Sequence, residues 1–173
     1  MSKNGFFTLI ILISLSIHSN SKENFIIGVL GNESVTFFEI EKYLKKHSNI
    51  QKAFDEYIAE RILLDYAEKL NIKPNLNLIL HNIELFAERL KTTPEALYKD
   101  KNFPLIRDDL INKLKIELLK KKIIDNNQKR LTKEENTSNQ DVSLVIENDD
   151  LIVNEFIEKL KKETYIKFIE NKI

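Results

Sequence analysis

The scarcity of glycine and proline is the feature that most narrows what this chain can fold into. Each occurs only three times in 173 residues, whereas the many tight turns of a β-sandwich or β-barrel depend on both. Hydrophobic residues make up 42% of the chain and charged residues 31%, so a buried core is expected and wholesale disorder is not. We therefore predict a mostly α-helical protein with one domain of ordinary size.

Residues 1–21 have the pattern of a signal peptide. Lys3 supplies a positive charge, residues 6–17 are mainly apolar, and Ser19 and Ser21 place small residues before an expected cleavage site that precedes Lys22. The apolar run of about a dozen residues is too short to cross a bilayer, which takes roughly 20. We expect export and cleavage; a buried helix or an uncleaved anchor is the alternative.

Apolar residues at helical spacing predict six helices, at residues 36–47, 50–70, 75–91, 93–98, 104–124 and 151–162. Thr36 and Glu39 form a capping box for the first helix, and Asn71 is expected as a left-handed residue after the second. The helix at 104–124 has two apolar faces, one with Ile106, Leu110, Leu114 and Leu118 and the other with Leu105, Ile116, Leu119 and Ile123. Such a helix belongs between layers or offers one face to a partner.

Two terminal segments predict a small β-sheet. The apolar run at 25–30 is followed by Gly31 and a second short β-rich segment at 34–36, which together read as a hairpin. A two-stranded hairpin alone is marginal in water. The alternating residues 165–169 are therefore expected as a third strand, which brings the two ends of the mature chain together.

The stretch between the long helix and the C-terminal helix is predicted to be mostly linker. Residues 125–141 are polar and show no apolar period, and residues 142–146 are a candidate strand. The chain then divides into a signal peptide at 1–21, a helical core at 22–124, a polar linker at 125–141 and a C-terminal segment at 142–173. We expect the last segment to complete the same domain as the core.

No catalytic or metal-binding motif is found in the sequence. The chain has no cysteine and three histidines, and no two histidines have ligand spacing on one helix face. The neighbouring carboxylates Asp108 and Asp109, like Asp149 and Asp150, diverge by about 100° on a helix and so do not converge as an acid–base pair. We expect no enzyme activity, no cofactor and no bound metal.

The charge pattern argues against nucleic acid as a partner. The 27 basic residues balance 27 acidic ones, so no long-range field attracts a polyanion. The basic cluster at residues 120–122, with Lys129, Arg130 and Lys133, lacks interleaved aromatic residues. It is interpreted as the solvated C-terminal end of a helix, where cations are favoured.

Residues 25–124 resemble the substrate-binding core of SurA-type periplasmic chaperones, and residues 151–169 resemble its C-terminal segment more faintly. The similarity begins with the segment IGVLGNESVT at 27–36, which is like the family's opening hairpin and capped helix. It continues with AEKLNI at 67–72, where Asn71 stands in place of the glycine in the family's Lys-x-Gly-[Ile/Val] helix stop. The Lys73-Pro74-Asn75 start and the Thr93-capped short helix follow in the family's order.

The resemblance implies a periplasmic, ATP-independent chaperone that holds unfolded exported proteins, outer-membrane proteins among them. Family members usually carry one or two parvulin-type prolyl isomerase domains between the long helix and the C-terminal segment. This chain has only residues 125–141 in that place, so isomerase activity is not expected. The membrane is expected as a partner only if the signal stays uncleaved.

Apolar residues left over from the expected core are the candidate client-binding residues. They are Leu78, Leu85, Leu97, Tyr98, Leu105 and Ile116; a place in the core is the alternative for each. The rival function is a secreted or envelope structural protein whose helical face docks one folded partner.

Overall fold

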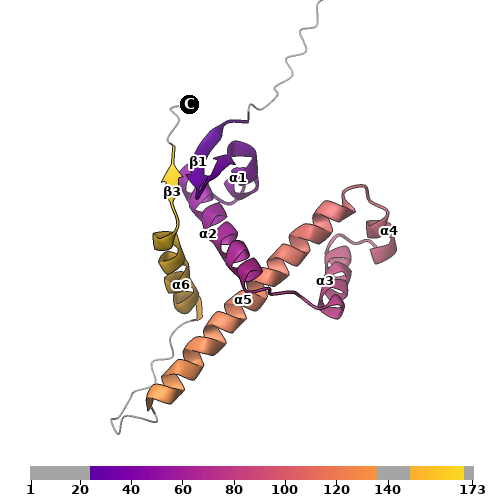
Figure 1. Cartoon of the computed structure of the whole chain (residues 1–173). Helices are drawn as coiled ribbons and strands as arrows, with labels where there is room; N and C mark the ends of the chain where they lie inside the picture. The colour runs from indigo at the N-terminus through magenta and orange to yellow at the C-terminus, as the bar shows by residue number, and fades with distance from the viewer. Residues whose placement is uncertain (1–23, 136–148, 170–173) are drawn as a thin grey trace, which may run out of the picture.

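A computed structural model describes residues 24–135 and 149–169. Within them the chain forms β1 (Ile26–Leu30), β2 (Glu33–Thr36), α1 (Phe37–Leu44), α2 (Ile50–Lys69), α3 (Leu76–Arg89), α4 (Pro94–Tyr98), α5 (Phe103–Glu135), α6 (Asp149–Glu163) and β3 (Ile166–Phe168). Figure 1 shows the helices dominating the molecule, with the small sheet at one end of α2. The predicted fold class, mostly α with one small sheet, is confirmed.

The sheet joins the two ends of the described chain in the strand order β2-β1-β3. Both pairings of the central strand β1 are antiparallel. The turn between β1 and β2 uses Gly31 at a φ of 59°, a backbone conformation that glycine adopts without steric cost. The Ile169 N–H donates to the Ile27 carbonyl at 2.8 Å and so extends the pairing of β3. The predicted third strand is confirmed.

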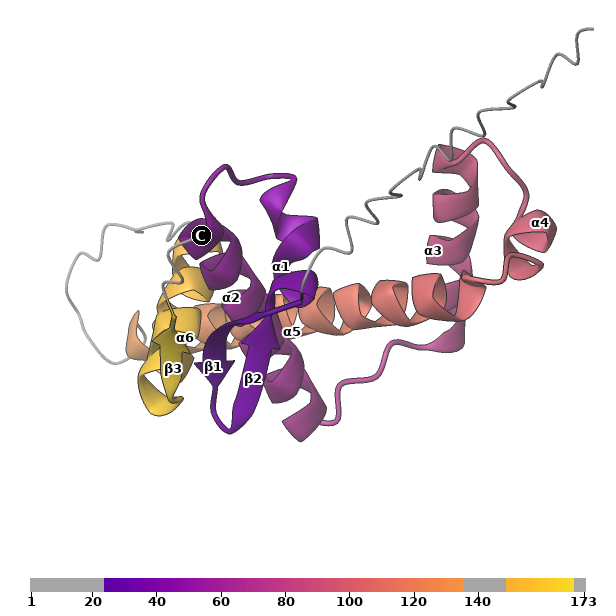
Figure 2. The same ribbon diagram turned by 90° about the horizontal axis from the view of Figure 1, so that it is seen from above.

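One hydrophobic core lies between the sheet and the helices α1 and α2. Ile27 and Val35 from the sheet meet Ile40 of α1 and Phe54 and Ile58 of α2, and all five are fully buried. Leu160 of α6 belongs to the same cluster. Figure 2 shows the three strands lying side by side across α2. The returning C-terminal segment therefore closes the core that the N-terminal hairpin opens.

Helix α2 is capped at both ends, by a polar side chain at its start and by a left-handed residue after its end. The Asn49 side chain accepts hydrogen bonds from the backbone N–H groups of Gln51 and Lys52, which satisfies two donors of the first turn. At the other end Asn71 has a φ of 53°, and the Ile72 N–H donates to the Ala67 carbonyl at 2.9 Å. This is a Schellman motif, and the left-handed conformation predicted for Asn71 is confirmed.

Helix α5 runs to Glu135, so the predicted helix end at Ile124 and the predicted start of the linker at Asp125 are wrong. Residues beyond Ile124 lack an apolar period, but residues 125–135 contain neither glycine nor proline. An established helix gains one backbone hydrogen bond for each added residue, and Lys, Arg, Gln and Glu are good helix formers. The rest of the linker, the candidate strand at 142–146 and the signal at 1–21 lie outside the described residues.

The two apolar faces of α5 are covered at different places along the helix. Its N-terminal half packs Ile106 and Leu110 against a cluster made by α3 and α4, whose centre is Ile83, Ala87 and Leu97. Its middle part, from Ile116 to Ile124, packs a different face against α2 and α6. Figures 1 and 2 show α3 and α4 at the N-terminal end of α5, away from the sheet. We call α3, α4 and residues 103–110 of α5 the arm.

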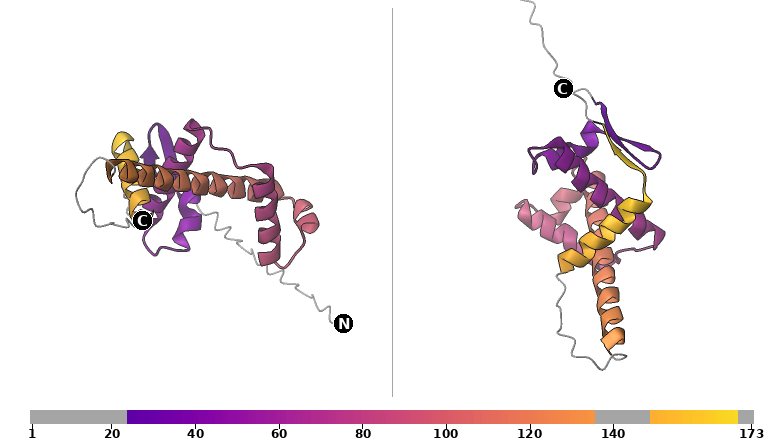
Figure 3. Two further views of the ribbon diagram at one scale, coloured as in Figure 1. Left: turned by 90° about the horizontal axis from the view of Figure 1, so that it is seen from below. Right: turned by 90° about the vertical axis from the view of Figure 1, so that its left-hand side faces the viewer.

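The opposite end of α5 extends past the other elements. The right-hand view of Figure 3 shows this, with α6 crossing beside α5 before the chain turns into β3. None of the helices in the described part of the chain is long and apolar enough to cross a membrane.

Candidate functional site

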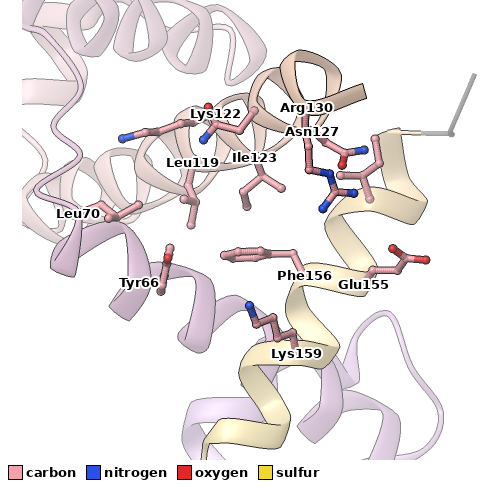
Figure 4. A pocket seen from close by; sticks show the side chains of 12 residues that line it. Tyr66, Leu70, Leu119, Lys122, Ile123, Asn127, Arg130, Glu155, Phe156 and Lys159 are labelled. Atoms are coloured by element: carbon pink, nitrogen blue, oxygen red, sulfur yellow. The ribbon is translucent and has the colours of Figure 1, made fainter. Parts of the chain in front are cut away.

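A groove lies where α2, α5 and α6 meet, and it encloses about 480 Å³. Figure 4 shows its lining from close by. The floor is apolar: it consists of Tyr66, Leu70, Leu119, Ile123, Ile152 and Phe156. The edge is polar: it consists of Lys122, Asn126, Asn127, Arg130, Glu155 and Lys159. A floor of this kind surrounded by a polar edge is the usual make-up of a binding site in a protein.

Helical spacing places the floor residues on facing helices. Leu119 and Ile123 are four residues apart on α5, and Ile152 and Phe156 are four apart on α6, so each pair shares a face. The Phe156 ring meets the Tyr66 ring edge to face, with centroids 5.2 Å apart. This aromatic contact ties α6 to α2. The space left between α5 and the other two helices forms the groove.

Leu70 brings an exposed apolar side chain to the groove. It is the C-cap residue of α2 and is 41% exposed, in contrast to Leu119, which is 1% exposed in the floor. The last turn of α2 thus adds accessible apolar surface to the groove.

Three cationic side chains and one acidic side chain lie at the polar edge of the groove. Lys122 and Arg130 come from α5, and Glu155 and Lys159 come from α6. Figure 4 shows the three cationic side chains at different points around the apolar floor. Among the side chains that the structure describes, neither Lys122 nor Lys159 has a carboxylate within salt-bridge distance. Both ammonium groups are therefore available to a ligand.

A second, smaller pocket of about 280 Å³ lies on another side of α5. Its polar lining has the opposite balance, with three acids and two lysines: Glu56, Glu60, Glu117, Lys113 and Lys120. The lining of this pocket therefore has no excess of positive charge. The excess of positive charge is specific to the larger groove.

The polar contacts between α1 and α2 hold the two helices together. Glu39 accepts hydrogen bonds from the Thr36 N–H at 2.7 Å and from the Tyr57 hydroxyl at 2.9 Å. Burial raises the pKa of Tyr57, and the Glu39 carboxylate raises it further. The phenol therefore stays neutral and donates. Burial alone would also raise the pKa of Glu39, but its hydrogen bonds from Thr36 and Tyr57 outweigh this and lower it.

A second polar cluster links α2 to the turn that follows α1. Glu56 of α2 accepts a hydrogen bond from the Lys46 ammonium at 2.8 Å and contacts the His47 ring. The Lys46 hydrogen bond lowers the pKa of Glu56, burial opposes this, and His47 adds to the lowering. Within the described residues no group of three potential ligands is placed to hold a metal ion.

The residues predicted to bind clients are divided by the structure, and none lines the groove. Leu97 lies at the centre of the arm cluster and Ile116 packs against α2 and α6; both are buried, which is the core position given as the alternative for each. Leu78 and Leu85 are half-buried on one flank of α3. Tyr98 and Leu105 are exposed, at 44% and 73%.

Sequence reasoning missed the groove for a geometric reason. The spacing of Leu119 and Ile123 on one helix, and of Ile152 and Phe156 on another, indicates only that each pair belongs to an apolar stripe. Whether two such stripes close tightly or leave a space depends on the angle at which the helices cross. One feature of the sequence could have indicated a binding site here. Lys122 directly precedes Ile123, an apolar residue of the groove, on a helix with two apolar faces.

Comparison with known proteins adds no relative. No protein family matches the chain, and no curated protein matches it.

Proposed function

We propose that this protein is an ATP-independent periplasmic chaperone that holds extended segments of unfolded exported proteins, outer-membrane proteins among them, without catalysing prolyl isomerisation. The groove between α2, α5 and α6 is the proposed binding site. The observation that carries the proposal is the apolar floor, which includes the half-buried Phe156 and the exposed Leu70. Unfolded chains expose apolar side chains, and burying them in such a floor is favourable.

The dimensions of the groove suit an extended polypeptide. Leu119 and Arg130 are eleven residues apart on α5, which corresponds to about 16 Å of helix. An extended chain rises about 3.3 Å per residue, so this wall runs beside roughly five residues of a client. Asn126, on the same wall, carries an amide that both donates to and accepts from a peptide backbone.

The rival proposal, a structural protein that docks one folded partner, draws on the arm. Leu76 and Leu90 of α3, Tyr98 of α4 and Leu105 of α5 are all exposed there. A folded partner meets a rigid surface with its own preformed surface. Under this proposal the arm, and not the groove, carries the binding energy.

Two leucines at equivalent helix ends separate the proposals. Leu70 and Leu90 are both C-cap residues with nearly the same backbone angles, φ −82° and ψ 2° against φ −83° and ψ 0°. Each precedes a residue with positive φ. Only Leu70 lines the groove. The variants Leu70→Ser and Leu90→Ser thus each remove an exposed leucine side chain from the same local structure.

The test is suppression of aggregation of two unrelated denatured proteins, reduced lysozyme and rhodanese. We expect the chain to suppress both, Leu70→Ser to do so severalfold less well, and Leu90→Ser to match the parent. Two results contradict the chaperone proposal. In the first, the parent suppresses the aggregation of neither denatured protein; in the second, only Leu90→Ser loses the suppression. The second of these results favours docking through the arm.

Export is part of the same proposal and has its own measurement. If Ser19 and Ser21 precede the cleavage site, the mature protein begins at Lys22. We expect the mass of the intact protein recovered from the periplasm to match this start. A mass that includes Met1 contradicts cleavage and favours an anchored protein.

A further inference from the structure

Resting on the proposed function, we infer that the groove selects client segments in which apolar side chains are flanked by acidic residues. The inference concerns the polar edge, whereas the chaperone proposal concerns the apolar floor. The edge carries Lys122, Arg130 and Lys159 against the single acid Glu155.

This positive edge does not follow from the overall composition of the chain. Basic and acidic residues balance at 27 each, and the smaller pocket on α5 has more acids than bases in its polar lining. Within the described side chains, some surface lysines are paired: Lys113 meets Asp109 at 2.7 Å and Lys161 meets Glu158 at 2.8 Å. Lys122 and Lys159 have no such partner.

The position of the two free ammonium groups defines the kind of segment that fits. Lys122 stands on α5 and Lys159 on α6, so the two cations come from different helices that line the apolar floor. Figure 4 shows the Phe156 ring and the Leu119 and Ile123 side chains between them. A bound segment that places apolar side chains on this floor brings its flanking residues to the cations. Carboxylates at those positions form ion pairs, whereas lysines are repelled.

The probes are three fluorescein-labelled peptides with blocked ends and the same centre, Leu-Phe-Leu. Glutamate, glutamine or lysine flanks this centre on both sides, which gives five residues, the length that the α5 wall accommodates. Affinity for the whole chain is measured by fluorescence anisotropy at low and at high salt. We expect the glutamate peptide to bind tighter than the glutamine peptide by roughly two- to fivefold for each ion pair. We expect the lysine peptide to bind most weakly. High salt should reduce the differences in affinity between the three peptides, because it screens the charges.

Two double variants locate the effect. Lys122→Gln with Lys159→Gln is expected to bring the ratio of glutamate to glutamine affinity toward one. Lys121→Gln with Lys162→Gln makes the same charge change on the same two helices at residues that line neither pocket, and is expected to leave the ratio unchanged. All four side chains replaced are on the surface, so helical circular dichroism should be the same throughout.

The outcomes separate this inference from the proposed function. Equal affinity for the three peptides, or equal loss of preference in both double variants, overturns the acidic preference while leaving a chaperone that binds apolar segments. Failure of every peptide to bind contradicts both. If sedimentation shows that the groove holds a second copy of the chain, as a dimer that peptide does not dissociate, the groove is a subunit interface and the inference is wrong.

Discussion

Gly28 occupies a position where a side chain has no room. A Cβ at this residue of β1 would lie 2.3 Å from Cε2 of Phe54 and 2.7 Å from the carbonyl oxygen of Lys167. Phe54 is among the largest fully buried side chains, and Lys167 belongs to β3. The close packing of the sheet on α2 therefore depends on glycine at this point.

Replacing each of two glycines by alanine tests this packing. We expect Gly28→Ala to lower the free energy of unfolding by about 3 kcal/mol, since a buried ring and a strand backbone must move apart. Gly31→Ala has open space around it but a φ of 59°, and should cost only about 1 kcal/mol. Urea denaturation of both variants measures the difference. If Gly31→Ala loses more free energy of unfolding than Gly28→Ala, the crowding around Gly28 in β1 is contradicted.

The carboxyl group of Glu56 links stability to pH. Because its pKa is lowered in the folded chain from the ordinary 4.5, the unfolded chain binds its proton more readily as the pH falls. Its stabilising contribution is therefore present above the ordinary pKa and is lost as the pH falls through the lower folded-state value. The Lys46 hydrogen bond at 2.8 Å is the main cause.

The matching experiment compares the parent with Glu56→Gln between about pH 7 and pH 3. The parent should be more stable than the variant at neutral pH, and the gap should shrink as the pH falls below about 4.5. Denaturant midpoints at each pH give the gap. A gap that stays constant over the whole range shows that Glu56 is not stabilised as a carboxylate.

Helix α5 is the element on which the described fold depends most. Its two apolar faces are covered by different neighbours, one face near its N-terminal end and the other near its middle. Leu105 and Ile116 are eleven residues apart and so lie within about 20° of each other around the helix, yet they are 73% and 8% exposed. The same face is thus solvent-exposed at the N-terminal end of the helix and part of the core near its middle.

Alanine substitutions along this helix should reproduce the difference. Leu119→Ala removes a side chain that is 1% exposed and should cost about 2–5 kcal/mol. Leu105→Ala is the matched control on the same helix and should change stability by less than about 0.5 kcal/mol. Thermal or urea unfolding measures both. Comparable losses for the two variants would mean that the N-terminal end of this face is covered.

At the scale of the whole molecule, α6 and β3 complete the body that the N-terminal hairpin begins. Four buried residues of α6 face the interior: Ile152, Val153, Ile157 and Leu160. Strand β3 pairs with β1, the central strand. Without them β1 would have an unpaired edge, which is a risk for aggregation.

Ending the chain after Asp141 tests this dependence. Each buried aliphatic side chain contributes about 1.5–3 kcal/mol before the entropy of ordering is subtracted. We expect the truncated chain to lose roughly 4 kcal/mol or more of its free energy of unfolding. The cooperativity and midpoint of its urea transition are the measurement. A transition identical to that of the whole chain would show that the C-terminal segment is an independent appendage.

Local features of this chain were determined by its sequence. The capping box of Thr36 and Glu39, the left-handed Asn71 and the strand near residues 166–168 all followed from short patterns. Each is settled by hydrogen bonds and backbone preferences within a few residues, or by the need to pair a hairpin. Residues 125–135 show no apolar period in the sequence, so the helix end predicted at Ile124 was wrong.

The groove and the coverage of each apolar face were decided only by the tertiary structure. Leu97 and Ile116 belong to the core while Leu105 is exposed, although all three have the same apolar character in the sequence. The groove exists because α6 crosses α5 and α2 at an angle that leaves space beside Phe156. Helical spacing gives the direction of a side chain from its own helix axis, but the distance to the next helix depends on how the whole chain packs.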